Sequence, residues 1–128
     1  MSSQLIKLSR IAAAIALFLG IVHETYTFGF VSTVKQLHAS WQELVLYMYL
    51  PTGLACLLAG ATMLLASSRS VQNWSLSNHI YFISATFMLV LGIGAPIAMS
   101  DNPFGYISLV GGVFSVAVGV LRYRQSMS

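Results

Sequence analysis

Four apolar stretches, each long enough to cross a bilayer, fill most of this chain of 128 residues. They cover residues 11–30, 44–66, 80–99 and 104–121. A helix of about 20 apolar residues spans the hydrocarbon core of a membrane. Hydrophobic residues make up 57% of the sequence and charged residues only 7%, which is too little polar surface to cover a water-soluble core. We therefore expect an all-α integral membrane protein.

The connections between these stretches are short, which favours a four-helix up-down bundle. Residues 1–128 are then a single transmembrane domain. The basic residues indicate its orientation, because cytoplasmic segments carry an excess of lysine and arginine. With both termini and the second connection in the cytoplasm, only Lys35 faces outside and five basic residues face inside: Lys7, Arg10, Arg69, Arg122 and Arg124. The sequence therefore predicts an N-in/C-in topology, and the net charge of +3 needs no nucleic-acid partner.

Small residues recur at helical spacing in the first and fourth stretches. They are Ala13, Ala16 and Gly20 in the first, and Gly105, Ser108, Gly112, Ser115 and Gly119 in the fourth. Small side chains let membrane helices approach closely, so we expect both stripes to be helix-packing surfaces. The first and fourth helices are neighbours in an up-down bundle. We therefore expect the two stripes to face each other, with Gly20 near Gly112 and His23 near Ser108.

The connection after the first stretch has apolar and aromatic residues at helical spacing: Val31, Val34, His38 and Trp41. This pattern predicts a short amphipathic helix lying on the membrane surface. Ser40 and Glu43 fit a capping box for the second helix.

His23 and Glu24 lie side by side within the first apolar stretch. Ionisable groups inside a membrane span are costly and usually face the bundle interior. In the predicted topology the carboxylates and two of the three histidines gather on the outer side. The candidate polar or ion site there consists of His23, Glu24, Ser108 and Asp101. In the alternative interpretation, His23 only hydrogen-bonds a serine of the fourth helix and Glu24 reaches the headgroup region.

Imidazole and carboxylate groups are also metal ligands. His23 and Glu24 begin like the helical H-E-x-x-H zinc motif, but Thr27 occupies the position of the second histidine. The candidate metal ligands are His23, Glu24 and His38. The spacing identifies neither a particular metal nor another cofactor.

Three functional hypotheses follow from these residues. In the first, the protein acts through helix packing as an accessory, assembly or stabilising subunit of a membrane complex or homo-oligomer. In the second, it is a small oligomeric transporter or channel that uses His23 and Glu24 for protons or cations. In the third, it is a membrane enzyme or metal-binding protein, for which few polar groups converge. The expected location is a bacterial inner membrane, with the bilayer and other membrane subunits or a second copy as partners.

Overall fold

The computed structural model of the chain describes residues 2–68, 71, 73–98 and 103–127 and folds them into four α-helices. The helices are α1 (Ser3–Val34), α2 (Ala39–Leu65), α3 (Trp74–Ala98) and α4 (Pro103–Met127). No strand occurs among these described residues. The predicted all-α class is confirmed, although α1 begins well before the apolar stretch that predicted it.

Three of the helices contain segments long and apolar enough to cross a membrane. These segments are Ser3–Tyr26 of α1, Trp74–Ile97 of α3 and Pro103–Met127 of α4. Large hydrophobic side chains such as Ile83 and Val110 are more than half exposed, as expected for surfaces that contact lipid. The described apolar segment of α2, Pro51–Leu65, is shorter, so a membrane crossing by α2 stays a prediction. The chain is a small membrane protein.

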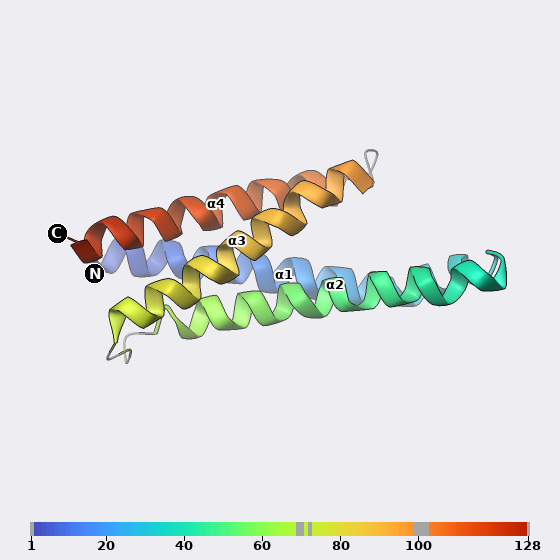
Figure 1. The fold of residues 1–128 in the computed structure, drawn as a ribbon, viewed down its shortest axis with the longest axis horizontal. Helices are drawn as coiled ribbons and strands as arrows, with labels where there is room; N and C mark the ends of the chain where they lie inside the picture. The colour runs from blue at the N-terminus through green and yellow to red at the C-terminus, as the bar shows by residue number, and fades with distance from the viewer. Residues whose placement is uncertain (1, 69–70, 72, 99–102, 128) are drawn as a thin grey trace.

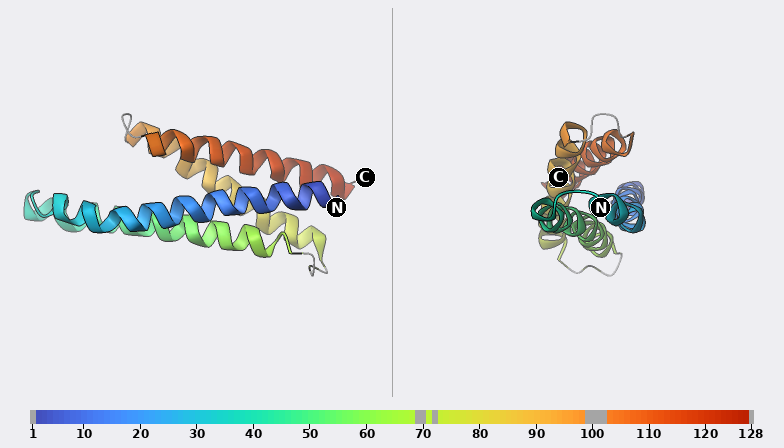
Figure 2. Two further views of the ribbon diagram at one scale, coloured as in Figure 1. Left: turned by 180° about the vertical axis from the view of Figure 1, so that it is seen from behind. Right: turned by 90° about the vertical axis from the view of Figure 1, so that its right-hand side faces the viewer.

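The helices are arranged as two antiparallel hairpins. Helix α1 packs along α2, and α3 packs along α4, with fewer contacts between the two pairs. The α3–α4 hairpin crosses the α1–α2 hairpin, whose far tip extends beyond it (Figure 1). Both termini lie at the opposite end (Figure 2), where the Ser2 backbone N–H donates to Gln125 Oε1 at 3.0 Å.

The two small-residue stripes pack within the hairpins and not against each other. A Cβ added at Gly20 of α1 would lie 2.7 Å from Leu57 Cγ of α2. A Cβ added at Gly112 of α4 would lie 2.7 Å from Leu89 Cα of α3. The prediction that the two stripes face each other is therefore wrong. Helices joined by a short connection usually lie side by side, and each stripe here packs against its partner helix in the hairpin.

Other residues of the stripes make similar close approaches. In α1, Ala13 and Ala16 are fully buried. In α4, Gly105 lies against Pro96 and Gly119 lies against Phe82, both in α3. Ser115 is buried and donates its hydroxyl to the Gly111 carbonyl at 2.8 Å.

A residue beside the predicted stripe connects α4 to α1. A Cβ added at Gly111 would lie 3.0 Å from Ile15 Cγ2. The face of α4 that carries the most small residues packs against α3. The adjacent face of α4 makes the looser contact with α1.

The segment after the first apolar stretch forms no separate surface helix, so that prediction is wrong. Val31 and Val34 belong to α1, and Trp41 belongs to α2, because the helical spacing continues the two long helices. The turn between them is closed by the Gln42 side-chain amide, which donates to the Leu37 carbonyl at 2.8 Å. Ser40 lies inside α2, which begins at Ala39, and is therefore not its N-cap.

Close packing at Gly112 predicts a sharp difference between two glycines. In Gly112→Ala the new methyl group meets the backbone of Leu89, whereas in Gly94→Ala of α3 it meets nothing within 4 Å. We expect Gly112→Ala to lower the free energy of unfolding by about 1–3 kcal/mol and Gly94→Ala to raise it by up to about 1 kcal/mol, because alanine favours a helix over glycine. Thermal melts in one detergent measure both. Equal melting temperatures for the two variants would contradict close packing of α4 on α3.

Candidate functional site

Arg122 is the most deeply buried charged residue that the structure describes. It lies in the last turns of α4, and only 1% of its surface is exposed. The charge pattern of the sequence assigned it to the cytoplasmic side but gave no sign that it is buried. The side chain enters the junction of the four helices near the end that holds both termini.

The Arg122 guanidinium uses all five of its N–H donors on neutral oxygen acceptors. These hydrogen bonds reach α1, the segment that follows α2, and α3. Nε donates to Asn78 Oδ1 at 3.0 Å, Nη1 donates to Ser9 Oγ at 3.1 Å and Ser67 Oγ at 3.3 Å, and Nη2 donates to the Ala66 carbonyl at 2.8 Å and Ser77 Oγ at 2.9 Å. One side chain of α4 therefore holds the other three helices together.

The three serines are oriented as acceptors by hydrogen bonds of their own. Ser9 donates to the Leu5 carbonyl at 2.7 Å, Ser67 donates to the Met63 carbonyl at 2.7 Å, and Ser77 donates to the Ala66 carbonyl at 2.5 Å. Each hydroxyl proton is thus committed to a carbonyl, which leaves the oxygen lone pairs for the arginine. The polar network is matched donor by donor, as a buried site requires.

An aromatic ring supplies further stabilisation of the buried charge. The Arg122 Cζ atom lies 4.4 Å from the centroid of the Tyr81 ring, a favourable cation–π distance. The Tyr81 hydroxyl is buried near Ser9, but the two groups lack the geometry of a hydrogen bond. No carboxylate is among the described contacts of Arg122. Its donors are saturated, so the site can hold helices together but offers no free donor to an anion.

His23 and Glu24 form a second polar site, within the α1–α2 hairpin. The His23 ring stacks on the Tyr49 ring of α2 with centroids 4.1 Å apart, and Tyr49 also stacks on Phe30 at 4.1 Å. A Cβ added at Gly53 would lie 2.8 Å from His23 Nδ1 and closer still to Glu24 Oε1. Gly53 therefore makes the space that both polar atoms enter, and Glu24 Oε1 has no hydrogen-bond partner among the described residues.

The other predicted site residues lie elsewhere. Ser108 donates its hydroxyl to the Phe104 carbonyl at 2.8 Å, and its backbone lies against Gly92 of α3. The described contacts thus do not include the predicted pairing of Ser108 with His23. Asp101 lies outside the described residues.

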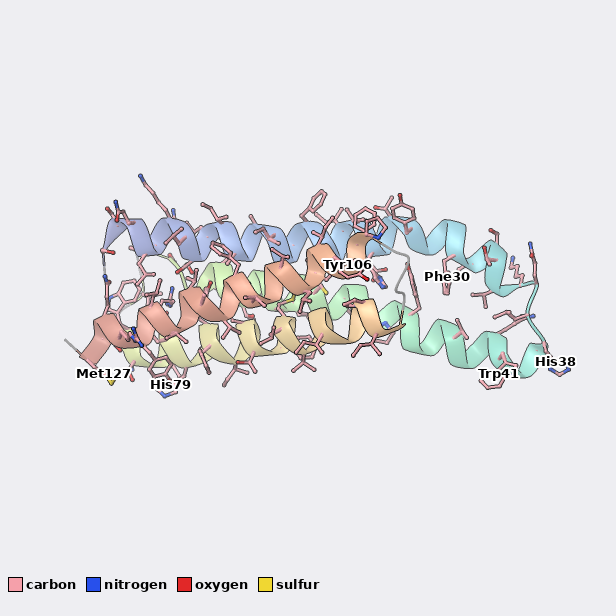
Figure 3. All side chains as sticks on the ribbon, turned by 90° about the horizontal axis from the view of Figure 1, so that it is seen from above. Phe30, His38, Trp41, His79, Tyr106 and Met127 are labelled. Atoms are coloured by element: carbon pink, nitrogen blue, oxygen red, sulfur yellow. The ribbon has the colours of Figure 1, made fainter. Side chains whose placement is uncertain are left out.

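The three candidate metal ligands do not all meet in the described part of the chain. His38 is exposed at the far tip of the α1–α2 hairpin (Figure 3), well along the hairpin from His23. No group of three or more histidine, cysteine, aspartate or glutamate side chains suited to a metal occurs among the described residues.

The sequence analysis missed the Arg122 site, although Arg122 and Ser9 both lie at helical spacing from the small-residue stripes. Arg122 follows Gly119 by three residues and so continues the small-residue stripe of α4. Ser9 precedes Ala13 by four residues and likewise continues the stripe of α1. Positions on a packing face are buried, so extending both stripes by one position would have indicated a buried polar contact at this end.

Comparison of the chain with known protein families, with characterised proteins and with solved structures finds no match in any of the three. Functional interpretation therefore rests on these two sites and on the surface.

The Arg122 network predicts a large loss of stability when its donors are removed. Arg122→Met leaves buried acceptors such as Asn78 Oδ1 without a donor, which costs about 2–4 kcal/mol of unfolding free energy. Arg122→Lys should also destabilise, because an ammonium group has three donors where the guanidinium has five. Thermal melts measure both variants. Arg124→Lys is the matched control, because Arg124 lies two residues later and is exposed. Melting of Arg122→Lys at the wild-type temperature would rule out the network as described.

The stacking of His23 on Tyr49 predicts that an aromatic ring at position 23 contributes more to the free energy of unfolding than a polar group does. His23→Phe retains an aromatic face for Tyr49 and should keep wild-type stability. His23→Gln loses the stack and should lower the free energy of unfolding by about 1 kcal/mol. Denaturation curves of the two variants test this order. The reverse order would show that hydrogen bonding by the imidazole, not stacking, stabilises the hairpin.

Proposed function

We propose that this small membrane protein acts through helix packing, as an accessory, assembly or stabilising subunit of a membrane complex or homo-oligomer. The observation that carries the proposal is the saturated Arg122 network. The most elaborate polar site of the described chain uses every guanidinium donor to hold helices together. Its chemistry is therefore that of a scaffold.

The outer surface supports the same proposal. Apolar side chains face outward along all four helices, including Phe18, Leu58, Ile83 and Val110. Such faces pack equally well on lipid or on another membrane helix. The proposed partners are the bilayer and other membrane subunits or a second copy of this chain.

The proposed arrangement is a four-helix up-down bundle with both termini in the cytoplasm, in a bacterial inner membrane. Exposed cations near the termini support this orientation: Lys7, Arg10 and Arg124. Lys35 is the exposed cation at the opposite tip of the α1–α2 hairpin. The cytoplasmic side of a membrane protein carries the excess of basic residues.

The orientation predicts which positions react with a membrane-impermeant thiol reagent. Single cysteines replace Ser2, Ser126 and Ser32 in turn, in a Cys56→Ala background. In intact cells we expect labelling at position 32 only, and labelling at 2 and 126 after the cells are opened. Reaction of either terminal position in intact cells would reverse the proposed topology.

Purification in a mild detergent tests the scaffolding role. The wild-type chain should copurify with another membrane protein at a fixed stoichiometry or elute as a homo-oligomer. Arg122→Met should weaken this association, because the helices that present the outer surface are no longer fixed. A chain that is well folded, monomeric and without partners under these conditions would contradict the proposal.

The second candidate function is proton- or cation-linked transport. It is favoured by the convergence of His23 Nδ1 and Glu24 Oε1 on the space above Gly53. Flux measured in liposomes distinguishes it, since His23→Phe keeps the ring stack but removes both ring nitrogens. A flux that is lost in this stable variant would support transport over scaffolding.

The third candidate, a membrane enzyme or metal-binding protein, has no comparable observation in its favour. Metal analysis of the purified protein tests it directly. A stoichiometric metal lost in His38→Ala would revive this hypothesis.

A further inference from the structure

A groove between α1 and α4 opens at the end of the molecule that holds both termini. Its volume is about 320 Å³. The walls come from the first turns of α1 and the last turns of α4, two helices that contact each other less closely than the partners within each hairpin. It borders the Arg122 network, since the Leu5 carbonyl accepts from Ser9, but the guanidinium donors of that network are all engaged.

The lining of the groove changes from apolar to polar along its length. The apolar residues are Leu5, Leu8 and Leu121. The polar residues are Ser2, Gln4, Arg124 and Gln125, and in both helices they lie nearer the end of the molecule than the leucines. This order matches a phospholipid, whose headgroup lies at the membrane surface and whose chains extend inward.

The charge around the groove selects the headgroup. Arg124 is exposed in its wall, and Lys7 and Arg10 are exposed on the same part of α1. The sequence places its acidic residues at positions 24, 43 and 101 only, so neither the first 23 residues nor α4 contains an acidic side chain. An anionic headgroup from outside the chain would therefore complement Arg124.

We propose that this groove binds one anionic phospholipid, with the phosphate on Arg124 and an acyl chain along Leu8 and Leu121. An arginine holds a phosphate oxygen pair with two parallel hydrogen bonds, and basic pockets between membrane helices bind anionic headgroups. Ser2 and Gln125 are joined by two hydrogen bonds across α1 and α4, at 3.0 Å and 3.3 Å, and they hold the polar end of the groove together. The bound lipid thus stabilises the packing of α1 on α4, which is less close than the packing within each hairpin.

Native mass spectrometry of the full chain, taken from nanodiscs of phosphatidylcholine and phosphatidylglycerol, tests the proposal. The wild type should retain one phosphatidylglycerol in preference to phosphatidylcholine. Arg124→Gln should weaken that preference about fivefold, as expected for one basic group at a membrane surface. Arg10→Gln removes the same charge from the same end, outside the groove lining, and should change it less than twofold.

Two further measurements distinguish binding in the groove from misfolding and from a general attraction of basic residues to anionic lipid. Melting temperatures in phosphatidylcholine alone should be equal for Arg124→Gln and wild type, which excludes misfolding as the cause. Leu121→Ala should also weaken retention, and inorganic phosphate should not displace the lipid, because the acyl chain contributes to binding. Equal effects of Arg124→Gln and Arg10→Gln, or no preference for phosphatidylglycerol in the wild type, would overturn the proposal.

Discussion

A guanidinium buried among apolar helices constrains the whole structure. An arginine costs about 2.5–3.5 kcal/mol at the centre of a membrane span and less near its end, and the N–H groups of a buried guanidinium must all be bonded. Arg122 meets this requirement with acceptors from Ser9 in α1, Ala66 and Ser67 after α2, and two residues of α3. None of these acceptors can shift alone without leaving a buried donor unpaired. The ends of four helices are thereby fixed relative to one another.

The remainder of the fold is held in a different way. Within each hairpin, glycines such as Gly20 and Gly112 bring backbones together and packing stabilises the contact. Between the hairpins the contacts are fewer, and the polar network supplies the directional bonds. The tip of the α1–α2 hairpin extends beyond α3 and α4 (Figure 1), because α1 and α2 have 32 and 27 residues whereas α3 and α4 have 25 each. In the α1–α2 hairpin, His23 stacks on Tyr49 of α2, and the polar atoms of His23 and Glu24 lie against Gly53 of α2.

The sequence was sufficient to predict the helices and the membrane, because long apolar runs and a low content of charge are properties of the sequence itself and need no knowledge of packing. It predicted the packing faces through the three- and four-residue spacing, but spacing does not say which helix a face meets. Each face packs on the neighbouring helix in sequence, so the stripe of α4 meets α3. Arg122 was missed for a related reason. An arginine near a helix end is ordinarily a surface cation. The burial of Arg122 could be inferred only from its position on the packing stripe, three residues after Gly119.

Arg122 and Arg124 show why charge counting and burial must be considered together. Two residues along an α-helix turn a side chain by about 200°, so the two arginines leave α4 on opposite sides. The inward one, Arg122, binds neutral acceptors, and the outward one, Arg124, is exposed. Among the exposed residues that the structure describes, the basic bias behind the proposed orientation rests on Lys7, Arg10 and Arg124 against Lys35. That bias keeps its direction without Arg122, because the exposed cations still gather at the end that holds both termini.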